Sequence, residues 1–74
     1  MKPYKNLSGD SGVVAYDIGK EHIDVQFRHG DAYRYDYPSA GAEHIENMKL
    51  LARAGRGLST YISRYVKDRY GSKL

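Results

Sequence analysis

Tyrosines at alternating positions are the side chains of this chain best suited to recognition chemistry. Tyr33, Tyr35 and Tyr37 follow a turn signal at Gly30, and every second side chain of a β-strand lies on the same face. If exposed beside arginines, the three rings would form a platform on which nucleic-acid bases stack. If buried, they would be core packing. The pairing of the strands decides between these two roles.

Residues for covalent or metal chemistry are scarce. The chain has no cysteine, which excludes disulfides, thiolate nucleophiles and thiolate metal sites. His22, His29 and His44 lie at spacings that match no metal-ligand motif. Asp24 and Asp36 are a candidate carboxylate pair on neighbouring strands, but carboxylates on a solvated strand face are usually surface residues. The sequence therefore predicts no catalytic residue, no metal, no cofactor, no small-molecule substrate and no enzymatic activity.

Positive charge is concentrated in the C-terminal half of the chain. Residues 1–37 hold five Lys/Arg against six Asp/Glu, and residues 38–74 hold seven against three, which together give the net charge of +3. A basic half favours an anionic partner, although a solvated helix face has the same composition. The cations that we expect to contact nucleic-acid phosphates are Lys49, Arg53, Arg56, Arg64 and Lys67.

One short segment is similar to a phosphate-binding loop. Gly55-Arg56-Gly57 precedes a predicted helix, and the first amides of a helix can hold an anion. The segment lacks the Lys-Ser/Thr of a P-loop, which argues against binding of a nucleoside triphosphate. A tight connection between two helices explains the same glycines, so both interpretations stay open.

The tyrosines belong to the second arm of a predicted hairpin. Residues 22–28 alternate polar and apolar without a break, which indicates a strand. A two-residue loop ending at Gly30 would place Val25 opposite Arg34, whereas a three-residue loop places it opposite Tyr33 and puts the glycine third. Because a one-residue slip moves every side chain to the other face, the apolar pattern predicts the three-residue loop. We therefore expect the tyrosine rings to face mainly the core.

Two helices are predicted after Pro38. The first begins at an N-cap Ser39 and ends at a C-cap Gly55. The second begins at an N-cap Ser59 and continues until Gly71 stops it. Its apolar stripe consists of Leu58, Tyr61, Ile62, Tyr65 and Val66.

The order of strands and helices predicts an α+β fold. We expect a three-stranded antiparallel sheet with two C-terminal helices packed on one face. Residues 1–10 are polar and predict a flexible N-terminal arm, and residues 11–74 predict a single domain. No apolar run is long enough to span a membrane, and no apolar stretch follows the basic start as in a signal peptide. The expected location is therefore the cytoplasm.

A series of aromatic, glycine and apolar residues extends along residues 11–70. Its members are Phe27, Gly30, Tyr33, Tyr35, Gly57, Leu58, Tyr61, Ile62, Val66 and Tyr70. In order and spacing this series resembles the KTSC domain, a family named for its occurrence at the C-terminus of some lysyl-tRNA synthetases and also found as a stand-alone short bacterial protein. The chain departs from the family pattern near Pro38 and before the second helix, where Arg56 stands in place of a lysine.

The resemblance implies an RNA-binding role, by association with a synthetase, and no demonstrated reaction. It also implies mainly structural roles for the motif residues. The resulting hypothesis is a small non-catalytic module that binds RNA, tRNA in particular, through a basic helical face. The alternative is a protein–protein interaction or structural module without nucleic-acid binding. The remaining sheet face is too charged for an obligate interface, so a monomer or weak dimer is expected.

Overall fold

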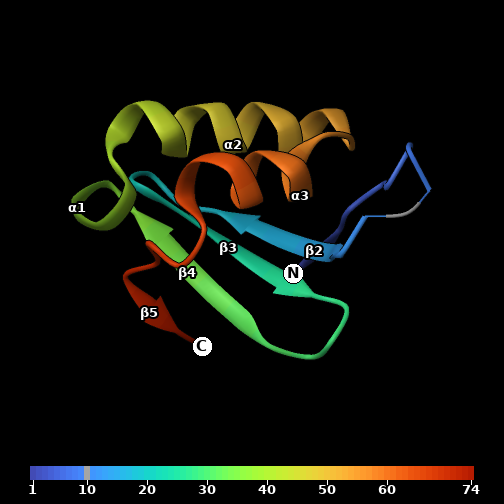
Figure 1. Ribbon diagram of the computed structural model, residues 1–74, viewed down its shortest axis with the longest axis horizontal. Helices are drawn as coiled ribbons and strands as arrows, with labels where there is room; N and C mark the ends of the chain where they lie inside the picture. The colour runs from blue at the N-terminus through green and yellow to red at the C-terminus, as the bar shows by residue number, and fades with distance from the viewer. Residues whose placement is uncertain (10) are drawn as a thin grey trace.

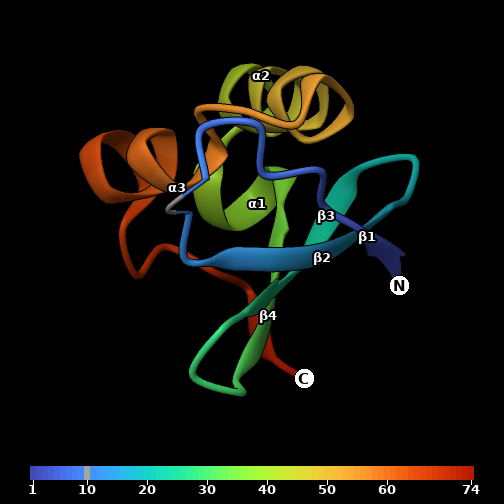
Figure 2. The same cartoon turned by 90° about the vertical axis from the view of Figure 1, so that its right-hand side faces the viewer.

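The chain folds into a five-stranded antiparallel sheet with helices on one face (Figures 1 and 2). The computed structural model describes residues 1–9 and 11–74. The strands are β1 (Lys2–Pro3), β2 (Val13–Ile18), β3 (His22–Phe27), β4 (Ala32–Asp36) and β5 (Ser72–Lys73), and each pairs with the next along the chain. The helices are α1 (Tyr37–Ala40), α2 (Ala42–Ala54) and α3 (Leu58–Tyr61), and α3 continues directly into a π-helical turn, η1 (Ile62–Val66).

The predicted α+β class is correct, but the predicted three-stranded sheet with two helices is wrong. Two edge strands of two residues each, β1 and β5, complete a sheet of five. Strands this short contain a single alternation of side chains, so they leave no periodic signal in the sequence. Both are recognisable only through their partners, β2 and β4.

The predicted arm contributes to the domain in the structure. β1 pairs with β2 through Lys2 and Pro3, and Tyr4 is only 6% exposed. The Tyr4 hydroxyl accepts a hydrogen bond from the amide of Leu58 at 3.3 Å, which joins the first residues to α3. Asp10, the last residue of the predicted arm, lies outside the described residues, and the boundary at residue 11 stays a prediction.

The predicted hairpin register is confirmed. Val25 lies opposite Tyr33 and Ile23 lies opposite Tyr35 in the β3–β4 pair. Gly30 takes a φ of 109° at the third loop position, a conformation that suits glycine because it has no Cβ. The buried face of the hairpin is therefore apolar across both strands.

The first predicted helix is interrupted. Asp36 caps α1, because its carboxylate accepts from the Ser39 amide at 3.0 Å while the Ser39 hydroxyl bonds to the Asp36 amide at 3.1 Å. Gly41, with φ 96° and ψ 143°, then separates α1 from α2. Tyr37 is the first residue of α1 rather than part of the strand, so the predicted row of three tyrosines is reduced to two. The predicted C-cap Gly55 is confirmed by its φ of 76°.

The second predicted helix is shorter than expected. It begins at Leu58 after Gly57, widens into the π-helical turn at Ile62 and ends at Val66, well before Gly71. Lys67 follows with φ 44° and ψ −112° and turns the chain back toward the sheet.

The core lies between the sheet and the helices. Its largest fully buried side chains are Val13, Ile23, Val25, Tyr35, Ile45, Met48, Leu58 and Val66. Four of them come from strands β2 to β4 and four from the helical layer, so the two layers hold each other in place. Among the described residues, no helix is long and apolar enough to cross a membrane.

Candidate functional site

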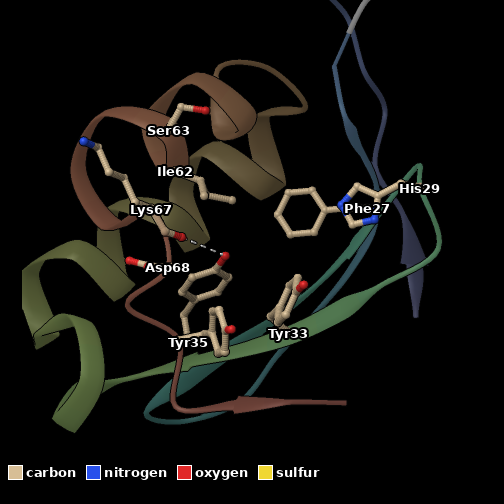
Figure 3. Close-up of a pocket in the computed structure, with 9 residues that line it drawn as sticks. Phe27, His29, Tyr33, Tyr35, Ile62, Ser63, Lys67 and Asp68 are labelled. Carbon is tan, nitrogen blue, oxygen red and sulfur yellow. Dashed lines mark hydrogen bonds between the residues drawn. The ribbon is translucent and has the colours of Figure 1, made fainter.

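A groove of about 480 Å³ opens between the β3–β4 hairpin and the end of the second helical segment. Its lining consists of Phe27, His29, Tyr33, Tyr35, Ile62, Ser63, Lys67, Asp68 and Tyr70. In Figure 3 the rings of Phe27, Tyr33 and Tyr35 surround a central hollow, with Ile62 above it; the Lys67 carbonyl lies on the hollow side, and the Lys67 amine points away from the rings. We call this site the aromatic groove.

The sheet side of the aromatic groove is built by the hairpin. Tyr33 and Tyr35 lie on one face of β4 because they are two residues apart. Tyr35 is 2% exposed, whereas Tyr33 is partly exposed. The Phe27 ring meets the edge of Tyr33 at 5.9 Å, and the His29 ring stacks on Phe27 at 5.6 Å with an interplanar angle of 3°. The hairpin therefore supplies one buried and three accessible rings.

The helical side of the aromatic groove is irregular. Ile62 and Ser63 belong to η1, and π-helical turns are rare and frequently occur at functional sites. Lys67, directly after η1, is one of two non-glycine residues with positive φ among the described residues. The Tyr35 hydroxyl donates to the Lys67 carbonyl at 3.4 Å. A strained backbone conformation of this kind persists only where the surrounding packing holds it in place. Such conformations cluster at binding and catalytic sites.

The third wall of the aromatic groove is Tyr70. Its ring stacks on Tyr33 at 4.4 Å and meets Tyr35 edge-on at 6.2 Å. The neighbouring Gly71 donates to the Arg34 carbonyl at 2.7 Å, which starts the pairing of β5 with β4. The unpredicted edge strand thus holds Tyr70 against the two tyrosines of β4.

Tyr33 and Tyr35 are neutral hydrogen-bonding groups at physiological pH. Burial, with smaller contributions from neighbouring Tyr33 and Tyr70, raises the pKa of Tyr35 to about 12. Burial and the nearby Asp31 carboxylate raise the pKa of Tyr33, whose hydroxyl donates to Asp31 at 3.3 Å. Groups with raised phenol pKa values hold their protons near neutrality, so these rings provide faces for stacking rather than bases for proton transfer.

The five cations predicted to contact phosphate do not form one patch. Lys49 is 5% exposed, and its amine donates to the Glu46 carboxylate and to the Lys20 carbonyl, both at 2.8 Å. Its charge is therefore already partnered inside the structure.

The other four cations are exposed but divided between two ends of the helical layer. Arg53 and Arg56 lie where α2 ends and α3 begins, whereas Arg64 and Lys67 lie toward the end of η1. The two helical segments run antiparallel in Figure 1. Residues 57–63 lie between the two pairs and span about 10 Å along the helical segment. Lys67 alone among the five lines the aromatic groove.

The candidate carboxylates on the polar face of the sheet have structural partners. Asp24 lies opposite Arg34 rather than Asp36, and its two oxygens accept from the guanidinium at 2.8 and 3.0 Å. Asp36 lies opposite His22 and caps α1. Both acids therefore satisfy neighbouring donors on the sheet and at the helix start.

The motif residues divide between the aromatic groove and the core. Those that line the groove are Phe27, Tyr33, Tyr35, Ile62 and Tyr70. Leu58 and Val66 are fully buried, Gly30 forms the hairpin loop and Gly57 precedes α3. The remaining residue, Tyr61, accepts a hydrogen bond from Asn47 at 3.1 Å and lies 2.6 Å from His44 Nδ1.

Sequence reasoning missed three residues of the aromatic groove. His29, Ser63 and Asp68 were not candidates. Ser63 and Lys67 share one helix flank by their spacing, but the sequence does not contain the information that this flank faces the hairpin.

No group of three or more His, Asp or Glu in the described part of the chain is arranged to hold a metal ion. Comparison with protein-family models, with curated proteins and with solved structures found no match. The resemblance to the KTSC domain therefore stays a prediction from the residues.

Proposed function

We propose that this chain is a small non-catalytic module that binds RNA, with tRNA as the expected partner, through an unpaired base in the aromatic groove. One observation carries the proposal: the solvent-accessible rings of Phe27, Tyr33 and Tyr70 line one groove together with an exposed lysine, Lys67, whose amine extends from the groove into solvent. Sequence-specific RNA recognition usually targets single-stranded positions, where unstacked bases lie against aromatic side chains. The resemblance to a domain of lysyl-tRNA synthetases points to the same class of partner.

The size and chemistry of the aromatic groove suit a flat, partly polar group. Its volume of about 480 Å³ falls within the range of small-ligand sites, about 300–1,000 Å³. The rings supply apolar faces, and the Ser63 and Tyr35 hydroxyls and the Asp68 carboxylate supply polar atoms at the border. A nucleobase combines the same two properties, because it has a π-face and a polar edge.

Local charge favours a polyanion over a peptide. Residues 58–70 hold three cations, Arg64, Lys67 and Arg69, against one acid, Asp68. Aromatic grooves also accept proline-rich peptides, which makes a protein partner the alternative. The groove lining itself holds one cation, Lys67, and one acid, Asp68, so the excess of cations in the flanking segment 58–70 is the reason to prefer RNA. With RNA as the partner, the cytoplasm is the expected location and a monomer or weak dimer the expected state.

The test is an amide-resolved NMR titration with a tRNA pool and with single-stranded oligouridylate, at low and at physiological salt. We expect salt-sensitive shifts at the aromatic groove, because affinity carried by phosphate contacts falls with salt. Shifts confined to Arg53 and Arg56 would place the binding surface at the other end of the helical layer. An absence of shifts at low salt would remove RNA as a partner and leave a protein partner as the leading alternative.

Two variants make the test specific. Lys67→Gln should lower the affinity for RNA at low salt. It should also reduce the slope of the logarithm of the binding constant against the logarithm of the salt concentration by about one, the value for one lost phosphate contact. Lys2→Gln, the same change at the exposed β1 edge, is the matched control and should leave both unchanged. Tyr33→Ala should lower the affinity by about fivefold or more, the lower limit for one stacked base. Equal affinities of wild type and Tyr33→Ala would contradict base binding in the groove.

A further inference from the structure

A second group of aromatic side chains lies outside the aromatic groove. Tyr65, on η1, is 51% exposed although tyrosine is large and mostly apolar. Its ring lies 4.6 Å from that of Tyr61 and stacks near-parallel on His44 of α2, with centroids 5.9 Å apart. We call these three residues the helix-face cluster.

The helix-face cluster is held in place by hydrogen bonds. The Tyr61 hydroxyl lies 2.6 Å from His44 Nδ1 and accepts from Asn47 Nδ2 at 3.1 Å. These bonds join α3 to α2 and fix the ring against which Tyr65 rests. An exposed aromatic side chain that is already oriented costs little further conformational entropy on binding.

The two aromatic sites flank the same helical turn. Ser63 lines the aromatic groove, whereas Tyr65 belongs to the helix-face cluster. Arg64 lies between them in sequence and is exposed. Buried Ile62 and Val66 direct the remaining side of η1 into the core. Arg64 therefore stands on the solvent side of the turn, between two sets of rings.

We propose that one RNA strand crosses η1, with one base in the aromatic groove, a second base on Tyr65 and the intervening phosphates beside Arg64. This inference rests on the proposed RNA binding and adds the length of strand that the site requires. A helix with its side chains is about 10–12 Å across, and stacked nucleotides of one strand are about 3.4 Å apart. At the stacked spacing about four nucleotides cover this distance, whereas a dinucleotide, with a single step between its bases, does not.

Charge complementarity supports a nucleic acid as the occupant of the helix-face cluster. Arg64 on η1, and Lys67 and Arg69 in the segment that follows it, are all exposed. None of the three has a salt bridge to an acid within the described residues. The exposed ring of Tyr65 is thus followed along the chain by cations that have no salt bridge among the described residues and is preceded by another such cation, Arg64, and rings combined with cations are what single-strand-binding surfaces use.

The experiment measures affinity against strand length by fluorescence anisotropy with labelled oligouridylates of about two, four, six and eight nucleotides. For the wild type, affinity should rise between two and about six nucleotides and then level off. Tyr65→Ala should lower the affinity for the longer strands by at least about fivefold and leave the dinucleotide unaffected. Tyr65→Phe keeps the ring and should restore wild-type affinity at every length.

Leu50→Ala is the matched control, because Leu50 is a 63% exposed apolar residue that belongs to neither site. This variant should bind oligonucleotides of every length with wild-type affinity. Circular dichroism should show that all variants are folded. Binding of long strands with no loss in Tyr65→Ala would overturn the second site and leave the proposed function intact. An equal loss for the dinucleotide and the longer strands would also overturn it. If no oligonucleotide binds at any length, the proposed function itself fails.

Discussion

Replacement of Tyr35 by alanine tests the assignment of this ring to the core. Tyr35 is 2% exposed and contacts both layers, since its hydroxyl reaches the Lys67 carbonyl. Large aromatic-to-alanine changes in cores cost about 3–5 kcal/mol. The side chain also lines the open aromatic groove, so water can fill part of the vacated space and the lower value, about 3 kcal/mol, applies.

That loss is a large fraction of the stability expected for this chain. At about 0.05–0.15 kcal/mol per residue, 74 residues give a free energy of unfolding of about 4–11 kcal/mol. For a domain of this size 1 kcal/mol corresponds to about 4–8 °C in Tm, so Tyr35→Ala should melt about 12–24 °C below the wild type. Thermal and urea unfolding followed by circular dichroism measure both quantities.

Tyr33→Ala is the matched comparison, because it removes the same side chain from the same strand face at a partly exposed position. Its cost should be about 1 kcal/mol, mainly from the lost ring contacts with Tyr70 and Phe27. The two variants should therefore separate stability from binding. A Tyr35→Ala melting curve within about 4 °C of the wild type would show that the ring is not part of the core, and the reasoning from burial would be refuted.

Three further predictions concern pH, helix capping and a buried cation. Because burial raises the pKa of Tyr35 to about 12, the folded protein keeps a proton that the unfolded chain loses near pH 10. This contribution to stability is complete below pH 10 and is lost as the pH rises to 12. In urea titrations the free energy of unfolding of Tyr35→Phe should therefore fall less between pH 10 and 12 than that of the wild type, by about 1 kcal/mol after allowance for solvent at the groove. An identical fall in the two proteins would contradict the assigned pKa. Asp36→Ala removes the carboxylate that caps α1 and should lower the free energy of unfolding by about 1 kcal/mol. Asp36→Ser provides another capping side chain and should keep most of this stabilisation. Equal stabilities of the two variants would count against the cap. Lys49→Met should leave the RNA affinity within about twofold of the wild type, because the Lys49 amine already donates to the Glu46 carboxylate and the Lys20 carbonyl. A larger loss of affinity in a binding titration would show that this lysine contacts RNA.

The features predicted correctly depend on residues close together in the sequence. The alternation of polar and apolar side chains through β3, together with a glycine at position 30, was enough to select the hairpin register. Gly55 was sufficient to mark the end of α2. In each case a few neighbouring residues determine the backbone conformation or the face on which a side chain lies.

The errors had both local and distant causes. Ser39 is a good N-cap by type, yet Asp36, only three residues earlier, is the N-cap and bonds to Ser39 in a helix that starts earlier. Lys49 has the spacing of a surface cation, yet the Lys20 carbonyl, 29 residues away in the sequence, draws it into the structure. Residue types and spacing predict which interactions are available, and the packing of the layers selects among them.

The sequence by itself determined the α+β class, the hairpin register and the concentration of tyrosine and basic residues, because these follow from composition and short-range periodicity. Only the tertiary structure decided that β5 holds Tyr70 against Tyr33, that η1 turns Ser63 and Tyr65 to opposite flanks, and that the five predicted cations lie apart. The physical reason is that contacts between segments far apart in the chain stabilise these features, namely the two-residue strands, the widened helical turn and the groove between the layers. Such contacts leave no local pattern in the sequence.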